Sequence, residues 1–401
     1  MKPADAKPLR IVFLSFDYWP PDFGGELLIS IERLQTLVER GHSVVVLTHR
    51  PLGSGRAERH GALSIRRCPV GGRSLAARAA YLLWAASALL CMSFDAIHLG
   101  VMPASRAPTG ALAAWLFASI AKARGARTVS VVSLADSEME AWHVSGRTRL
   151  FRWLYYHRVD RIVAVSPALF EPLYQWRLGK AVLITCGVRD DLFTPLSSEE
   201  RRLARKQLGI PEDGVVFMTI GAVIQRKGYD LLAQAFAALN PKHGNWFLWM
   251  VGPMPHGCTA DQWELVELLA PLRQYKSQVR CFGRIDDRGE LRRLLGASDV
   301  FVFPTRREGF GLAPVEAMAM ALPVIVARIP GVTDVAPVDQ ETGLFVPVGD
   351  VEALVQAMER LGNDSGLRAT LGSKARQRIA KEFSWESHIA RWEKLYSQGV
   401  A

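Results

Sequence analysis

Short apolar segments alternate with helical segments along this 401-residue chain, and this alternation limits the possible folds more than any other feature. The first segment, RIVFLSF at 10–16, is apolar almost throughout, as a buried parallel strand requires. A helix is expected from about Glu26 to Gly41, with the next strand at 42–48. Further strands are expected at 95–100, 128–134, 161–166 and 181–187. This order predicts an α/β fold with a doubly wound parallel sheet and ligands at the carboxyl ends of its strands.

The same alternation starts again in the second half of the chain. Strands are expected at 215–221, 246–252, 279–283, 299–305 and 323–327, and helices near 229–239, 261–275, 289–296 and 312–321. Residues 190–212 interrupt the pattern with polar and helical segments, so we expect the linker there. The length suits two domains. We predict a first domain at 1–195, a second at 196–384, and an amphipathic helix at 385–401 that packs back on the first domain.

Composition excludes several classes of protein. With 49% hydrophobic and 22% charged residues, the chain resembles a soluble globular protein and not a disordered one. The polar N-terminus is unlike a secretory leader, which favours a cytoplasmic protein. The longest uncharged stretch, 79–94, is too short to span a membrane, so we expect it to form a buried or interfacial helix. The five cysteines lie far apart and form no C-x-x-C pair, so neither disulfides nor a structural metal is expected.

Positive charge is concentrated in the first half. Residues 1–195 hold 24 Lys and Arg against 15 Asp and Glu, whereas residues 196–401 hold 25 against 24. Segments 66–84 and 146–161 combine arginine with leucine and aromatic residues, as helices on anionic lipid do, although buried helices with a basic edge explain them equally well. The first domain is therefore a candidate for peripheral contact with the inner face of the plasma membrane. No nucleic-acid-binding module is present, so no nucleic-acid partner is expected.

The most informative stretch is 299–327. A strand ends at Pro304, a loop carries Glu308, and the helix that follows carries Glu316. Glycines in the loop let the backbone approach a ligand, and amides at the helix start favour a diphosphate. A carboxylate in the loop can accept hydrogen bonds from sugar hydroxyls, and one in the helix can bind a ribose diol. The alternative is an ordinary strand-to-helix turn.

Two further turns suit the same ligand. Arg226 and Lys227, beside Gly228, follow a predicted strand and could neutralise a departing nucleoside diphosphate, although a solvated basic turn is the alternative. Gly24 and Gly25 open the first helix, where backbone amides could meet the phosphates from the other domain, or could form a plain turn. The sequence contains no D-x-D, so we expect no metal.

With these motifs the chain resembles the retaining glycosyltransferases of family four, whose E-x7-E signature corresponds to Glu308 and Glu316. The resemblance implies the GT-B fold, with two Rossmann-like domains facing each other across a cleft. It implies that Glu308 contacts the transferred sugar, Glu316 the ribose, and Lys227 the leaving group; whether Arg226 replaces the arginine that the family usually has at position 222 stays open at this point. The residues expected to bind the donor are Gly24, Gly25, Gly228, Ile285, Gly309, Phe310, Gly311, Leu312 and Glu316.

The function implied by the resemblance is transfer of a sugar from a UDP- or GDP-linked donor to a hydroxyl of a glycan or lipid-linked acceptor. The first domain would bind the acceptor, in polysaccharide or glycolipid biosynthesis, without a metal or other cofactor. The chain departs from the family at Ala222, where arginine is usual, at Cys186, and at 134–138, which lacks the usual histidine; Asp136, Glu138 and His143 are nearby polar candidates. Two alternatives remain: an epimerase or hydrolase of nucleotide sugars, and a non-catalytic sugar-binding protein.

Overall fold

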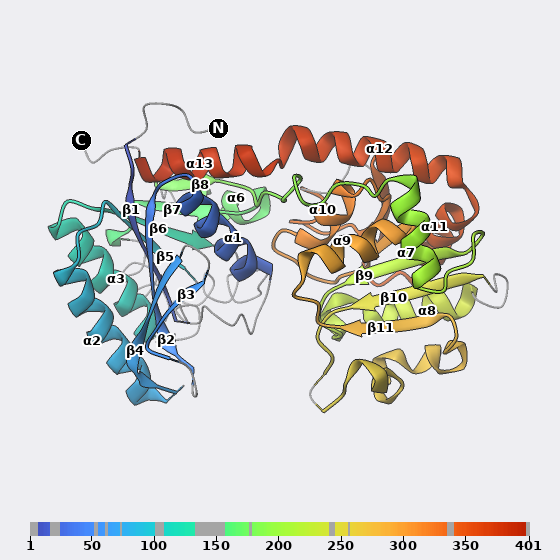
Figure 1. Ribbon diagram of the computed structural model, residues 1–401, viewed down its shortest axis with the longest axis horizontal. Coiled ribbons are helices and arrows are strands. Elements are labelled where there is room, and N and C mark those ends of the chain that lie inside the picture. The colour runs from blue at the N-terminus through green and yellow to red at the C-terminus, as the bar shows by residue number, and fades with distance from the viewer. Residues whose placement is uncertain are drawn as a thin grey trace. The chain divides into compact units, whose positions relative to one another are not determined.

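The computed structural model divides the chain into two units (Figure 1). Unit 1 consists of Met1–Cys186 with Glu386–Ala401, and unit 2 of Gly187–Trp385, whereas the sequence places these boundaries after 195 and 384. The structure describes residues 7–16, 25–51, 55–60, 63–72, 74–100, 108–132, 157–175, 179–239, 245–255, 257–334 and 341–397.

Unit 1 is built on an eight-stranded sheet in the order β3-β4-β2-β1-β5-β6-β7-β8. Its strands are β1 (Arg10–Ser15), β2 (Ser43–Arg50), β3 (Ala57–His60), β4 (Leu63–Gly71), β5 (Ala96–Leu99), β6 (Arg127–Val132), β7 (Arg161–Ala164) and β8 (Ala181–Leu183). All neighbouring pairs are parallel except β3 with β4. The five strands expected in this half after the first are present, but β3 and β4 form a hairpin that the sequence analysis missed. The beginning of the basic segment 66–84 lies in β4 and is not helical.

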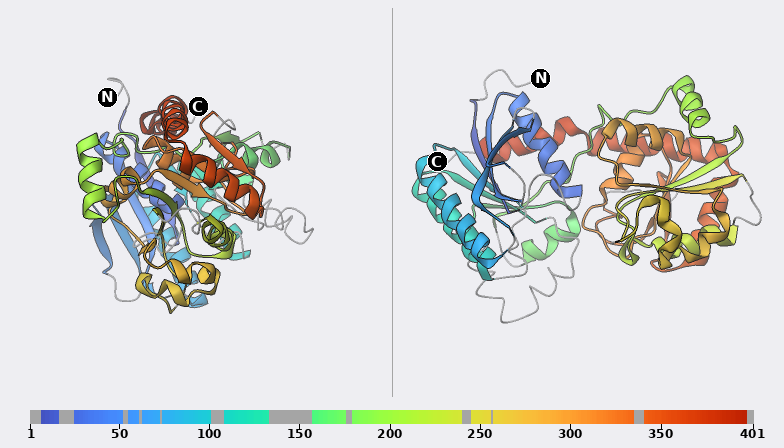
Figure 2. Two further views of the ribbon diagram at one scale, coloured as in Figure 1. Left: turned by 90° about the vertical axis from the view of Figure 1, so that its right-hand side faces the viewer. Right: turned by 60° about the horizontal axis from the view of Figure 1, so that its bottom comes forward.

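Helices cover both faces of this sheet, as Figure 2 shows from two further directions. They are α1 (Gly25–Glu39), α2 (Leu75–Cys91), α3 (Pro108–Ala123), α6 (Pro167–Gln175) and α13 (Trp385–Ser397). Residues of α2, α3 and α6 share one apolar core with Val12 and Leu14 of β1. Ser74 caps the start of α2, because its side chain accepts a hydrogen bond from the backbone N of Ala77.

The last helix, α13, packs within unit 1 although it follows unit 2 in the chain. Its Trp392 stacks on His98 of β5 with 5.1 Å between ring centroids, and the Arg33 guanidinium lies 4.0 Å from the Trp392 ring centroid. Glu393 forms an ion pair of 2.9 Å with Arg40, the residue that follows α1. The C-terminal helix thus closes the side of the sheet that carries α1.

Unit 2 has a six-stranded parallel sheet in the order β11-β10-β9-β12-β13-β14. Its strands are β9 (Val215–Ile220), β10 (Trp246–Val251), β11 (Val279–Gly283), β12 (Val300–Phe303), β13 (Val324–Ala327) and β14 (Gly343–Val346). The helices are α7 (Ser198–Gln207), η3 (Gln225–Lys227), α8 (Tyr229–Leu239), η5 (Ala260–Leu265), η6 (Glu267–Tyr275), α9 (Arg288–Ala297), α10 (Leu312–Ala319), α11 (Val351–Asn363) and α12 (Ser365–Glu382).

One expected helix of unit 2 has a different form. The segment 261–275 forms two short 3-10 helices, η5 and η6, where an ordinary helix is predicted. Gln262 has non-helical backbone angles, and Pro271 lacks the N–H that a continuous α-helix would use.

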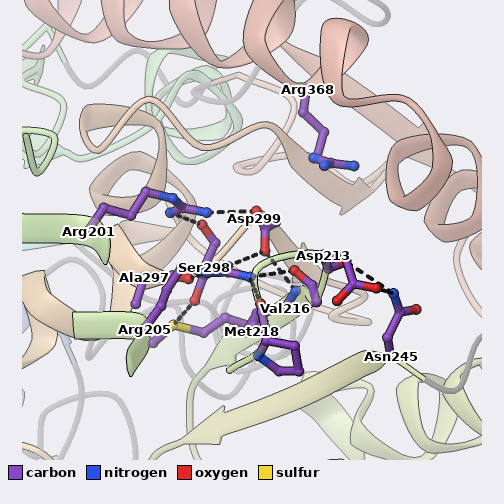
Figure 3. A network of polar contacts seen from close by, with 12 residues as sticks. Arg201, Arg205, Asp213, Val216, Met218, Asn245, Ala297, Ser298, Asp299 and Arg368 are labelled. Carbon is purple, nitrogen blue, oxygen red and sulfur yellow. Dashed lines mark hydrogen bonds and ion pairs between the residues drawn. The ribbon is translucent and has the colours of Figure 1, made fainter. Parts of the chain in front are cut away.

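The prediction of a linker at 190–212 is wrong, because α7 lies in this segment and packs on α9 within unit 2. Arg201 and Arg205, one turn apart on α7, both reach the carboxylate of Asp299 at the start of β12 (Figure 3), with N–O distances of 2.7 Å and 2.9 Å. The Asp299 carboxylate also accepts a hydrogen bond of 2.8 Å from the backbone N of Val216. The polar residues of this segment are therefore part of the folded domain.

Candidate functional site

The predicted site residues of unit 2 follow two adjacent strands. The chain runs from β9 to β10 and β11 on one side, and then returns to β12 on the other side of β9. Parallel pairing places Val300 of β12 beside Phe217 of β9. A reversal of this kind leaves a crevice outside the carboxyl ends of the two central strands, which is where ligands bind in open α/β sheets. The segments 221–228 and 304–311 both begin there.

Lys227 and Glu308 form an ion pair at this edge, between Lys227 Nζ and Glu308 Oε2. Their side chains are only 15% and 14% exposed. Arg226 Nη1 lies 3.9 Å from the same carboxylate oxygen and donates a hydrogen bond of 3.0 Å to the carbonyl of Arg307. One carboxylate therefore faces two cations; Lys227 is largely withdrawn from water, which strengthens its electrostatic effect on a ligand, whereas Arg226 is 39% exposed.

Gly228 allows these two segments to approach. It has φ +76°, in the left-handed region, and a Cβ atom there would lie 2.0 Å from the carbonyl oxygen of Pro304. The backbone N of Arg306 donates to the carbonyl of Arg226 at 2.8 Å. Any side chain at position 228 would therefore push the Lys227 turn away from the Glu308 loop.

A second ion pair, between Arg306 and Asp230, joins the same two segments. Arg306 donates from both terminal nitrogens to the two oxygens of Asp230, at 2.7 Å and 2.8 Å, and also to the carbonyl of Gln225 at 2.6 Å. Burial is the largest single influence on the pKa of Asp230 and would raise it, but the hydrogen bonds and positive charge of Arg306, together with backbone hydrogen bonds, outweigh burial and the pKa is lowered. The same hydrogen bonds raise the pKa of Arg306. This pair could not be predicted from the sequence, because nothing in the local pattern links residues that lie in different elements.

Glu316 has its own cation. It lies on α10 with a side chain that is 8% exposed, and it accepts a hydrogen bond of 2.9 Å from Arg288 Nη1 at the start of α9. The Arg288 guanidinium in turn lies 5.2 Å from the ring centroid of Phe193. The two carboxylates of the signature therefore sit in separate ion pairs, and Arg288 is a second residue that the sequence did not reveal.

The loop between the two glutamates leads into the start of α10. Gly311 is the N-cap, with φ +83° and no side-chain hydrogen bond to the first turn, so the amides from Leu312 onwards have no side-chain cap. Phe310 is buried and meets Phe383 edge to face, with 6.2 Å between ring centroids. A Cβ atom on Gly331 would lie 2.8 Å from the carbonyl oxygen of Gly309, so the backbone at Gly331 packs closely against the loop. The loop thus anchors itself with side chains and leaves a helix N-terminus suited to an anion.

The remaining predicted residues belong to other segments of the chain. Gly25 is the first residue of α1 in unit 1, and Gly24 lies outside the described residues, as do Asp136, Glu138 and His143. Ile285 is partly buried in the connection between β11 and α9, just before Arg288. Within the described ranges, no group of three or more His, Cys, Asp and Glu side chains is arranged to hold a metal ion.

Two family models match the chain, one in each half. Residues 200–378 match the model described as glycosyl transferases group 1, and residues 33–187 match the glycosyl transferase 4-like domain.

Curated relatives match over part of their length. The capsular polysaccharide biosynthesis glycosyltransferase CapM of Staphylococcus aureus is 30% identical over 245 residues, 59% of this chain and 60% of the relative. The D-inositol 3-phosphate glycosyltransferase of Salinispora arenicola is 36% identical over 252 residues, 60% of this chain and 55% of the relative. The chain thus spans less than two thirds of the length of these relatives.

Solved structures match over nearly the whole chain. Sucrose-phosphate synthase from Thermosynechococcus elongatus superposes with a TM-score of 0.77 at 22% identity, covering 97% of this chain and 98% of that one. HepE of Anabaena, in complex with UDP-glucose, gives a TM-score of 0.75 at 18% identity, covering 97% and 100%. At this identity the likeness shows the fold alone, and it confirms the predicted GT-B class with two Rossmann-like domains.

Proposed function

Because the chain belongs to glycosyltransferase family four, the group 1 glycosyltransferases, we propose that it transfers a sugar from a nucleotide-sugar donor with retention of configuration. The observation that carries the proposal is the pair of Lys227 and Glu308 at the carboxyl ends of β9 and β12, beside the uncapped start of α10. A cation, a carboxylate and a helix N-terminus together suit a sugar diphosphate.

The proposed roles follow from the charges. Lys227 and Arg226 would stabilise the negative charge that develops on the leaving diphosphate, since both lie beside Glu308 and one carboxylate does not neutralise two cations. Glu308 would accept hydrogen bonds from hydroxyls of the transferred sugar. Glu316, held by Arg288, would bind the ribose diol. These fixed cations would allow transfer without a metal.

The donor and the acceptor are proposed by class. The donor would be a UDP- or GDP-linked sugar; for the UDP form, the support is a structure of similar fold that is in complex with UDP-glucose. The acceptor would be a hydroxyl of a glycan or of a lipid-linked saccharide, in keeping with a relative named for capsular polysaccharide biosynthesis. The departure at Ala222 leaves Arg226 as the second cation of the site, and its position 3.9 Å from Glu308 supports that role.

The test uses UDP-, GDP- and ADP-sugars with EDTA present, first in a thermal-shift assay and then for slow donor hydrolysis. Lys227→Ala should abolish both stabilisation and hydrolysis. Lys276→Ala is the matched control, because this lysine follows η6, pairs with Glu264 of η5 and is 60% exposed. Glu308→Gln should abolish hydrolysis yet still bind the free nucleoside diphosphate, because Lys227 is then released from its partner.

Three results would contradict this proposal. Stabilisation by no nucleotide sugar would favour the non-catalytic binding protein. A requirement for added metal would remove the role assigned to the fixed cations. Complete conversion of the donor to an epimer or to free sugar at a rate that no acceptor changes would favour the epimerase or hydrolase alternative.

A further inference from the structure

The outward face of α2 in unit 1 is apolar. Leu75, Leu83 and Leu90 are 73%, 73% and 57% exposed, and their spacing places them on one side of the helix. The opposite side carries the buried residues Ala77, Tyr81, Ala85 and Leu89. Arg78 is the one charged residue in the α2 sequence. A helix on a water-facing surface normally has a polar outer face, so this face requires an apolar environment.

The neighbouring helix α3 extends this apolar surface. Helices α2 and α3 pack against each other and run side by side over the same face of the sheet in both figures. Leu112 of α3 is 52% exposed. Among the described residues, five large apolar side chains are more than half exposed, and four of them lie on these two helices: Leu75, Leu83, Leu90 and Leu112, with Leu265 of unit 2 as the fifth. Single exposed leucines are ordinary, but this concentration marks a contact surface.

Cations lie at one end of the apolar surface. Arg124, which follows α3, donates to the carbonyls of Leu90 and Met92 at 3.2 Å and 3.1 Å, so it sits at the C-terminal end of α2. Arg66 of β4 reaches the Met92 sulfur at 4.0 Å, and Lys122 is exposed in the last turn of α3. The sequences of α2 and α3 contain no acidic residue. The two helices therefore present apolar groups with cations at one end, and neither helix contributes a carboxylate.

We propose that this α2–α3 face docks on the surface of an anionic lipid bilayer. The leucines would enter the boundary between headgroups and acyl chains, and Arg66, Lys122 and Arg124 would meet lipid phosphates. Within the described residues no helix is long and apolar enough to cross a membrane, so α2 would lie along the surface. Membrane contact would give the enzyme access to a lipid-linked acceptor, and only this purpose of the contact rests on the proposed function.

A second copy of the chain fits this face less well. In a symmetric dimer through the same surface, the cations that lie at the end of the patch would approach their own copies, and no carboxylate of α2 or α3 could pair with them. Anionic headgroups satisfy both the apolar and the cationic groups.

The test measures co-sedimentation of the full chain with phosphatidylcholine vesicles, with and without phosphatidylglycerol, at low and high salt. The wild type should bind the anionic vesicles, and more weakly at high salt. The variant with Leu75→Gln, Leu83→Gln and Leu90→Gln should bind at least about tenfold more weakly. Circular dichroism should show that this variant remains folded.

Two further variants separate the contributions. The matched control is Leu203→Gln with Leu265→Gln, which alters two leucines of unit 2 that are 49% and 69% exposed, and it should bind as the wild type does. Arg66→Gln with Lys122→Gln should weaken binding at low salt and reduce its dependence on salt.

The proposal is overturned by any of three outcomes. These are no binding of the wild type to anionic vesicles, equal binding by the triple leucine variant, and a concentration-dependent dimer in light scattering that the same variant abolishes. Because no donor is present, these results are independent of catalysis. Donor hydrolysis by the triple leucine variant, measured in detergent-free solution, reports separately on the proposed function and should be unchanged.

Discussion

Replacing Asp299 by asparagine should destabilise unit 2 through the network that holds α7. The carboxylate lies between Arg201 and Arg205 and also accepts from the backbone of Val216. Asp299 and Arg205 are 12% and 11% exposed, so this pair is shielded from water, whereas Arg201 is 33% exposed. The asparagine side chain keeps one acceptor and turns an N–H donor toward a guanidinium, which leaves a buried cation without its counter-charge.

The magnitude follows from the two ion pairs. Breaking one partner of a buried pair costs about 3–5 kcal/mol, and an exposed pair contributes about 0–1 kcal/mol. Arg205 keeps its hydrogen bonds to the carbonyls of Ala297, Pro211 and Gly214, which favours the lower end of the first range. We therefore expect a loss of about 3 kcal/mol, a large fraction of a typical domain stability of about 5–15 kcal/mol.

The assay is urea unfolding followed by fluorescence, since unit 2 holds the buried Trp246, Trp249 and Trp263. With a denaturant dependence of about 2–3 kcal/mol per molar, the midpoint should fall by about 1 M. Glu199→Gln is the control, because its pair with Arg202 on the same helix is 73% and 63% exposed, and its midpoint should not move. An unchanged midpoint for Asp299→Asn would refute the argument that α7 is held by this carboxylate.

Three further predictions concern the site and the C-terminal helix. Gly228→Ala should lower the free energy of unfolding by about 1–3 kcal/mol more than Gly209→Ala does. Both positions have positive φ (+76° and +73°), but only at Gly228 would the new Cβ atom meet backbone atoms. Comparable losses for the two variants in urea unfolding would contradict this. Arg306→Lys should weaken donor binding about tenfold in calorimetry, because lysine cannot make the bidentate hydrogen bond to Asp230. In a double-mutant cycle with Asp230→Asn the losses of binding free energy should be non-additive, and additive losses would mean that the pair does not position the loop. Burial lowers the pKa of His388 to about 3, so below about pH 6.5 the unfolded chain takes up a proton that the folded chain does not bind. The free energy of unfolding should therefore fall by up to about 1.4 kcal/mol per pH unit as the pH falls. His388→Gln should reduce this slope in unfolding measured between about pH 7 and 5, and an equal slope would exclude the histidine as its source.

The sequence predicted β9 to β13 of unit 2 because these buried strands are continuous apolar runs, such as WFLWMV of β10 and VFVF of β12, but it did not predict β14, α11 or α12. It also placed Lys227 and Glu308 at strand ends. What it could not predict is that β9 and β12 are neighbours, since strand order depends on contacts between distant parts of the chain. The approach of the lysine to the glutamate is a consequence of that order.

The errors have a related cause. Arg201 and Arg205 resemble solvated residues of a polar linker until Asp299, in another element, is known to face them. The pairs of Arg306 with Asp230 and of Arg288 with Glu316 likewise join separate elements and leave no local pattern. The hairpin of β3 and β4 was missed because the segment 57–71 contains several arginines and a glutamate, unlike the apolar strands of the sheet interior. β3 is the edge strand of the sheet, which explains its charged residues, whereas Arg66 and Arg67 lie on β4, one strand further in.

The distribution of charge within unit 2 supports one orientation of the proposed donor. Lys227 and Arg226 share a single carboxylate, Glu308, so this part of the site carries an excess positive charge beside the uncapped start of α10. Glu316 and Arg288 form a nearly buried ion pair, in which the carboxylate faces a guanidinium of opposite charge. A diphosphate is negatively charged and a ribose is neutral, so the first group suits the phosphates and the second the ribose. The reverse orientation would place the phosphates beside this ion pair and leave two cations facing neutral hydroxyls, which is less favourable in a site withdrawn from water.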